Sequence, residues 1–178
     1  MADSPPLILI TGIMAAGKST VAQHLAERLP KSVHLRGDAF RRMIVNGRAE
    51  MDLDLTADAY EQLRLRYLIA ATVAELYLKA GFAVVYQDII IGPALAEVVE
   101  GFGYRPLYVV VLCPSPEVIA EREAGRGKTG YRSATADAFD RAFRAETPRL
   151  GLWLDSSGLT VAETVEHILA NLASARVS

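Results

Sequence analysis

The chain has 178 residues, of which 51% are apolar and 22% are charged. This composition excludes global disorder and allows one sizeable hydrophobic core. A net charge of −2 argues against a general nucleic-acid binder, and a single cysteine, Cys113, excludes an intramolecular disulfide. The apolar runs are too short to cross a membrane, and the first residues, MADSPP, lack the basic region of a signal peptide. We therefore expect a soluble, cytoplasmic protein.

Five short segments are continuously apolar, a pattern typical of strands that are covered on both faces. They span residues 7–11, 32–36, 83–87, 107–113 and 152–154. Segments of helical character lie between them, so the sequence predicts parallel strands joined by right-handed crossovers. We expect a single three-layer α/β domain over residues 1–178, with helices on both faces of a parallel sheet.

Several helices carry recognisable start signals. Ser and Thr are preferred N-caps, and proline is tolerated in the first helical turn. The start signals are Thr56 as the N-cap of a long helix that ends near residue 79, Ser115 followed by Pro116, and a capping box of Thr160 with Glu163. A further helix is indicated over residues 18–29, where apolar residues recur every four positions.

Residues 12–19 read GIMAAGKS and match the full spacing G-x-x-x-x-G-K-[ST] of a phosphate-binding loop. The motif follows an apolar strand and opens an amphipathic helix, as its chemistry requires. Gly12 and Gly17 let backbone N–H groups turn toward phosphate oxygens, and the helix N-terminus adds about half a positive charge. The alternative, a glycine turn without a ligand, requires a chance match on the order of a per cent per chain.

The loop therefore predicts binding of ATP together with Mg²⁺. Lys18 can reach the β- and γ-phosphates as a catalytic cation, and the Ser19 hydroxyl can bind the metal ion. The expected nucleotide-binding residues are Gly12, Ala15, Ala16, Gly17, Lys18, Ser19 and Thr20.

Asp38 follows the second predicted strand, where an open α/β sheet presents ligand-facing residues. Its carboxylate could accept a proton from a substrate hydroxyl that attacks the γ-phosphate, or hold that hydroxyl in line. Arg41 and Arg42 lie one helical turn further on. The alternative is that Asp38 is a helix N-cap, which does not exclude a catalytic role.

Asp88 follows the third predicted strand, where a carboxylate can serve Mg²⁺ directly or through water. We expect Ser19 and Asp88 to hold the metal ion, and Asp88 also to contact the substrate. An ordinary polar residue at a strand end is the alternative. The apolar segment 89–93 either lines a substrate pocket or packs in the core.

Residues 121–132 read EREAGRGKTGYR and combine cations with three glycines. We expect a lid over about residues 122–135, in which Arg126 and Arg122 close over the triphosphate and stabilise the charge of the transferred group. An arginine in this role contributes about 10³–10⁵ in rate. The alternative is a solvated, charged helix end.

The segment 40–56 is the expected wall of the acceptor pocket. Its mixed apolar and acidic character disfavours a highly anionic acceptor. The expected acceptor-binding residues are Asp38, Arg41, Met43, Met51 and Asp88, although core packing explains methionines equally well.

Taken together, these motifs resemble the small P-loop kinases, in particular the zeta-toxin-like and chloramphenicol-phosphotransferase-like group. The resemblance rests on LILITGIMAAGKST, GDAFRR, VVYQDIIIG, VLCPSPEVIAEREAGRGKTGY and LDSSGLTVAETVEHIL. It implies a five-stranded parallel sheet in the order 2-3-1-4-5, Mg·ATP as donor and Asp38 as general base. The chain departs from many relatives at Gln87, where they have the first of two adjacent acids.

The leading hypothesis is a kinase that transfers the γ-phosphate to a hydroxyl of a small molecule, with an antibiotic as one candidate. A toxin-like kinase of nucleotide sugars and a regulatory ATPase without an acceptor are the alternatives. We expect no nucleic-acid partner, because the net charge is −2 and the chain lacks a basic, aromatic-studded groove, and no membrane partner, because the apolar runs are short.

Overall fold

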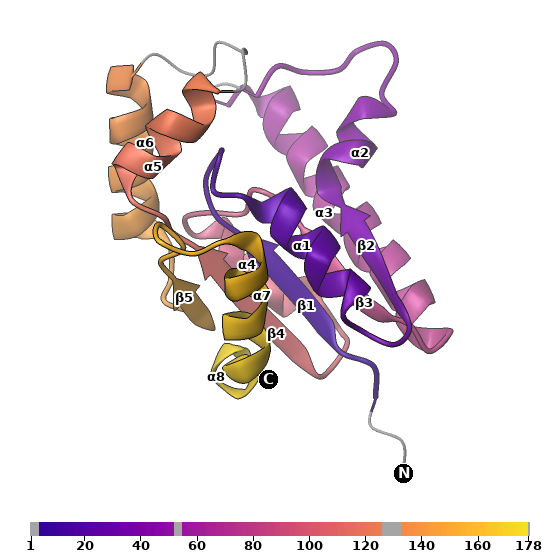
Figure 1. The fold of residues 1–178 in the computed structure, drawn as a ribbon. Coiled ribbons are helices and arrows are strands. Elements are labelled where there is room, and N and C mark those ends of the chain that lie inside the picture. The colour runs from indigo at the N-terminus through magenta and orange to yellow at the C-terminus, as the bar shows by residue number, and fades with distance from the viewer. Residues whose placement is uncertain (1–3, 52–54, 126–132, 178) are drawn as a thin grey trace.

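The computed structural model describes residues 4–51, 55–125 and 133–177, and the side chains of residues 133–138 are left out of the description. Five parallel strands form one sheet in the order β2-β3-β1-β4-β5 (Figure 1). The strands are β1 (Leu7–Thr11), β2 (Ser32–Arg36), β3 (Ala83–Gln87), β4 (Leu107–Leu112) and β5 (Leu152–Leu154). The predicted strands and the predicted strand order are thus confirmed, with β4 one residue shorter than expected.

Helices cover both faces of this sheet, as expected (Figure 1). The helices are α1 (Lys18–Glu27), α2 (Gly37–Arg42), α3 (Ala57–Lys79), α4 (Ala94–Gly101), α5 (Pro116–Ala124), α6 (Ser133–Glu146), α7 (Val161–Ala170) and α8 (Leu172–Ala175). None of the helices in the described ranges is both long enough and apolar enough to span a membrane.

The central strand β1 shows why its sequence is continuously apolar. All five of its residues are buried, but alternate side chains point to opposite faces. Leu7 and Leu9 pack with α3, α4, α5 and α6, whereas Ile8 and Ile10 pack with α1, α7 and α8. The strand therefore contributes to two cores at once, which is the environment that its pattern predicted.

The predicted N-caps are present. The Thr56 hydroxyl accepts a hydrogen bond from the Ala59 N–H at 3.2 Å. Ser115 caps α5, with Pro116 as the first helical residue. Thr160 and Glu163 form the reciprocal capping box at the start of α7. These local signals therefore fixed where three of the helices begin.

Candidate functional site

The phosphate-binding loop runs from the end of β1 to the start of α1. Gly12, Ala15 and Gly17 adopt positive φ angles of 140°, 57° and 89°. A Cβ at Gly12 would lie 2.3 Å from the Leu112 carbonyl oxygen, so the loop can cross the end of β4 this closely only with glycine. Lys18, the first residue of α1, is 8% exposed, and its Nζ donates a hydrogen bond to the Ile13 carbonyl oxygen at 2.6 Å. The backbone thus has the turn that the motif predicts.

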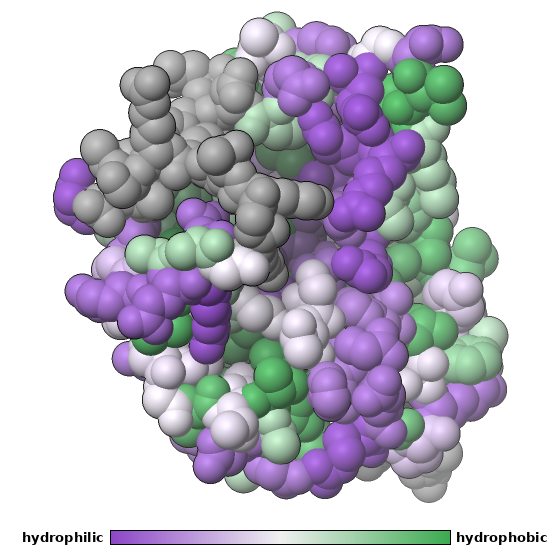
Figure 2. Space-filling model, turned by 45° about the horizontal axis from the view of Figure 1, so that its top comes forward, coloured by the Kyte–Doolittle hydropathy of each residue, from purple (hydrophilic) through white to green (hydrophobic). Residues whose placement is uncertain are grey.

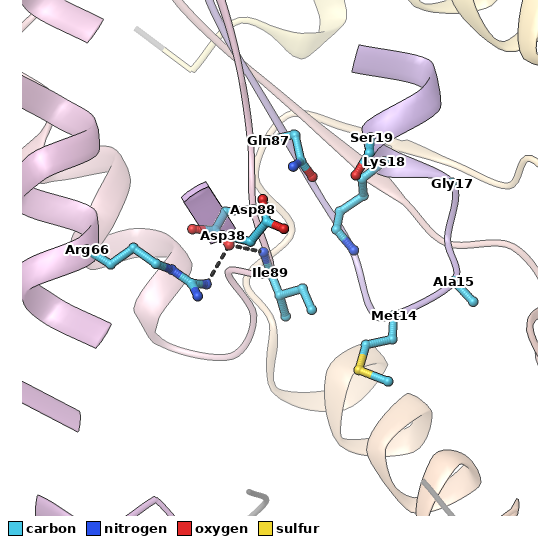
Figure 3. Close-up of a pocket in the computed structure, with 10 residues that line it drawn as sticks. All are labelled: Met14, Ala15, Gly17, Lys18, Ser19, Asp38, Arg66, Gln87, Asp88 and Ile89. Carbon is cyan, nitrogen blue, oxygen red and sulfur yellow. Dashed lines mark hydrogen bonds and ion pairs between the residues drawn. The ribbon is translucent and has the colours of Figure 1, made fainter. Parts of the chain in front are cut away.

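A cavity of about 240 Å³ lies at the carboxyl edge of the sheet, beside this loop. Figure 2 shows that this edge of the molecule is hollowed next to a band of hydrophilic residues. Figure 3 shows side chains from the loop, α1, α2, α3 and β3 turned toward one space. The lining residues are Met14, Ala15, Gly17, Lys18, Ser19, Asp38, Arg66, Gln87, Asp88 and Ile89.

Asp38 lies on the far side of this cavity from the loop, as the second residue of α2. Arg36 occupies the N-cap position, and no side chain caps the helix, so the N-cap interpretation of Asp38 is wrong. The Asp38 carboxylate is 38% exposed and pairs with Arg42 one turn later and with Arg36 at 3.8 Å. Two arginines therefore pair with a carboxylate that remains accessible from the cavity.

Asp88 directly follows β3 and is 4% exposed. Its Oδ1 accepts hydrogen bonds from Arg66 at 2.5 Å and from the Ile89 N–H at 2.8 Å, and its Oδ2 accepts one from the Tyr86 hydroxyl at 2.9 Å. Burial raises the pKa of the Asp88 carboxyl, whereas the Arg66 guanidinium and the other two donors oppose that rise. Burial and the neighbouring Asp88 raise the pKa of Tyr86, so its hydroxyl remains a donor at neutral pH.

Gly37, the first residue of α2, lies against the Asp88 carboxylate. A Cβ at Gly37 would be 2.0 Å from Asp88 Oδ2. The buried carboxylate therefore sets how closely α2 approaches the end of β3. Because Asp38 follows Gly37, the same contact helps to fix the candidate general base.

Arg66 lines the cavity but was not predicted from the sequence. It comes from the middle of α3, its side chain is 11% exposed, and its ion pair with Asp88 spans 22 positions in the chain. The sequence did hold a signal for a buried Arg66. It lies four residues before Ala70 and therefore on the buried side of an amphipathic helix. A buried arginine needs an anionic partner, but helical spacing does not say which one.

Arg122, on α5, contacts the end of the phosphate loop. Its Nη1 and Nη2 donate to the carbonyl oxygens of Ala16 and Ser156, both at 3.5 Å. Arg126 and the rest of segment 126–132 of the predicted lid lie outside the described residues. The end of that predicted lid, residues 133–135, belongs to the first turn of α6.

The other predicted site residues lie outside the lining of the cavity. Arg41 donates from Nη2 to the Ala49 carbonyl oxygen at 2.7 Å, and Met43 is 70% exposed. Met51 is half-buried further along the same segment. Within the loop region, Gly12 and Ala16 are buried and Thr20 is exposed on α1. The acceptor-binding role of segment 40–56 stays a prediction.

A Mg²⁺ ion that accompanies a nucleotide would be held mainly by oxygen atoms. Ser19 lines the cavity and fits this role. Asp88 already accepts three hydrogen bonds on roughly four lone-pair sites, so about one site remains for a metal ion or for a water molecule bound to it. In the described ranges, no cluster of three His, Cys, Asp or Glu could hold a metal alone. The residues fit a cation held by Ser19 and phosphate oxygens, with Asp88 contributing directly or through water.

Comparisons with solved structures show the same fold at low sequence identity. A tunicamycin resistance protein from Deinococcus radiodurans is 18% identical, with a TM-score of 0.72 over 98% of this chain and 99% of that one. A sugar kinase from Janibacter sp. HTCC2649 is 18% identical, with a TM-score of 0.70 over 96% of each chain. A gluconokinase from Sinorhizobium meliloti 1021 is 23% identical, with a TM-score of 0.67 over 96% of this chain and 93% of that one.

Comparison at the level of sequence gives a family. No curated protein sequence matches the chain significantly. Residues 7–148 match the family described as an AAA domain, and this range includes the phosphate loop, Asp38 and Asp88. Because the match spans most of the chain and the strand order is that of the P-loop kinase fold, the chain belongs to this AAA-domain family and folds as a P-loop kinase does.

Proposed function

We propose that the protein is an ATP-dependent kinase that transfers the γ-phosphate to a hydroxyl of a small molecule. The observation that carries the proposal is the single cavity that places Lys18 of the phosphate loop opposite the accessible carboxylate of Asp38. A nucleotide switch needs the loop but has no use for a carboxylate at the acceptor position. The kinase names of the sugar kinase and the gluconokinase support the same reaction class.

In the proposed reaction, an acceptor hydroxyl lies between Asp38 and the γ-phosphate. Its oxygen forms a bond to the γ-phosphorus while the bond from that phosphorus to the bridging oxygen of ADP breaks, and Asp38 takes the hydroxyl proton. Lys18 and backbone N–H groups of the loop stabilise the charge on the phosphate oxygens. Mg²⁺ held by Ser19 would neutralise part of that charge when bound. Arg122 and Arg126 are the proposed lid cations.

The acceptor is proposed to be a small hydroxylated compound. Six of the ten residues that line the cavity are polar or charged, namely Lys18, Ser19, Asp38, Arg66, Gln87 and Asp88. An antibiotic stays a candidate because of the resemblance to chloramphenicol phosphotransferases and the likeness to a tunicamycin resistance protein. We propose that the chain acts as one domain, without a nucleic-acid or membrane partner.

The test is phosphate transfer from γ-labelled ATP and Mg²⁺ to a panel of hydroxylated acceptors, with nucleotide binding measured separately by calorimetry. Asp38→Asn should lower kcat about 10²–10⁴-fold while it retains nucleotide binding, because only proton transfer and acceptor orientation are lost. Lys18→Ala should lose transfer and weaken nucleotide binding without unfolding. Glu27→Gln, which neutralises an exposed carboxylate at the other end of α1, is the matched control and should change neither.

Two outcomes contradict the proposal. Robust ATP hydrolysis without label on any acceptor would favour the regulatory ATPase. Full transfer activity in Asp38→Asn would show that Asp38 has no role in the chemistry.

A further inference from the structure

Helix α3 has an apolar ridge on the side that faces away from the sheet. Its buried residues, such as Ala70 and Ala74, pack against the core on the opposite side. The ridge consists of Leu65, Leu68 and Leu76, which are 49%, 65% and 63% exposed. At 100° per residue these three leucines fall on one face of the helix, so they form one strip rather than scattered surface residues.

Two grooves lie beside this ridge, between α3 and the end of α4. One, of about 230 Å³, is bordered by Arg64, Leu68 and Phe102, and the other, of about 150 Å³, is bordered by Leu68, Glu75 and Phe102. Leu68 therefore belongs to the ridge and also borders both grooves. Because Leu68 and Phe102 border both grooves, the grooves extend the apolar surface of the ridge toward α4 and enlarge the face that a second copy could cover.

The charges along α3 have the same two-fold symmetry. In an antiparallel pair of α3 helices centred on Ala70, positions equally far before and after Ala70 lie opposite one another. Glu61 then lies opposite Lys79 of the other copy, nine positions from the centre in each case. The two ends of the pairing are equivalent, so this attraction occurs twice.

The neighbouring charges extend this pattern. Lys79 already pairs with Glu75 in its own helix at 2.6 Å, and Arg64 falls next to Glu75 of the other copy. Each end thus becomes a row of alternating charges. At the centre Leu68 meets Thr72, whose hydroxyl donates to the Leu68 carbonyl oxygen of its own helix at 2.9 Å and leaves its methyl group for apolar contact.

We propose that this surface of α3 is the interface of a two-fold homodimer, with a second copy of the chain as its occupant. The inference is independent of the proposed kinase activity, because the ridge and the lining of the active-site cavity are different residues. The dimer buries the three leucines of each copy and aligns opposite charges at both ends of the helix pair.

The first test is the mass of the protein in solution from about 1 to 100 μM, measured by sedimentation velocity. The wild type should shift from monomer to dimer within this range. Leu68→Glu should remain monomeric throughout, because it places like charges at the centre of the interface. Val45→Glu, at an 88% exposed position outside α3, is the matched control and should dimerise as the wild type does.

The second test uses charge reversal. Glu61→Lys and Lys79→Glu should each weaken the dimer about tenfold or more when alone, since each places two like-charged pairs across the interface. An equimolar mixture of the two variants should regain the dimer, because both ends of the mixed pair then carry opposite charges. Circular dichroism of each variant should match the wild type, as expected for exposed positions.

A wild type that stays monomeric over this range overturns the proposal and leaves the ridge for a different partner. A dimer that persists in Leu68→Glu places the interface elsewhere. Failure of the mixed variants to associate would exclude the antiparallel arrangement.

Discussion

At the level of single residues, Asp88 connects the end of β3 to α3 and to the start of α2. Its carboxylate is held by Arg66 from α3 and Tyr86 from β3, and it lies against Gly37 at the start of α2. Removing one partner of a buried ion pair leaves an uncompensated charge, which is costly. The contacts of Asp88 therefore explain its burial without assigning it a direct bond to a metal ion.

The contact with Gly37 gives a sharp prediction. Gly37→Ala places a Cβ 2.0 Å from Asp88 Oδ2, so either the carboxylate or α2 has to move. We expect a loss of about 1–3 kcal/mol in the free energy of unfolding, measured by denaturant titration, together with impaired phosphate transfer. Gly158→Ala is the control, because a Cβ at Gly158 has no atom within 4 Å among those described. Equal stability of the two variants would show that Asp88 does not restrain α2.

At the level of elements, β2 and α1 are joined by a hydrogen bond between His34 and Gln23. His34 Nδ1 lies 2.9 Å from Gln23 Oε1, and as the tautomer that carries the proton on Nδ1 it donates to that oxygen. Burial and the charge of Arg36 lower the pKa of His34 from 6.5, and Asp38 opposes this. The folded protein therefore binds fewer protons at this site than the unfolded chain does below pH 6.5.

The sign of the pH effect follows from this lowered pKa. The contribution of His34 to stability is complete above pH 6.5 and is lost as the pH falls through the lower pKa of the folded state. Between about pH 7.5 and 5.5 the thermal midpoint of the wild type should fall more than that of His34→Gln, which keeps a donor for Gln23. His167→Gln is the control. Equal losses in wild type and His34→Gln would contradict the argument.

Local sequence signals located most elements but not all of them. The strands and the starts of α3, α5 and α7 follow from apolar runs and caps that act within a few residues. Helices α4 and α6 were not predicted. The sequence places residues 133–135 in a lid, whereas the structure has them at the start of α6. Later in this helix, Phe139 and Phe143 lie one turn apart and pack against the core. Glycines and charges before that helix obscured its apolar stride.

At the level of the whole molecule, the two cores share one sheet, so they should unfold together. Strands β1 and β4 contribute alternate residues to both cores. Trp153, the single tryptophan, lies on the edge strand β5 with its ring 5.3 Å from that of Phe143. Denaturant curves from Trp153 fluorescence and from far-UV circular dichroism should therefore coincide in one transition, at a low and fixed protein concentration. An earlier fluorescence transition would show that β5 and its neighbours form a separate unit.

The sequence by itself determined the phosphate loop, the strand segments and the candidate acid Asp38, because each depends on residues that are close along the chain. The tertiary structure decided which of the predicted site residues share a cavity. It brought Arg66 to Asp88 and left Arg41 and Met43 outside the cavity lining. It also exposed the leucine ridge of α3, which helical spacing alone does not distinguish from a second core face. Both outcomes depend on how the helices pack on the sheet, and that packing is set by contacts between residues far apart in the chain.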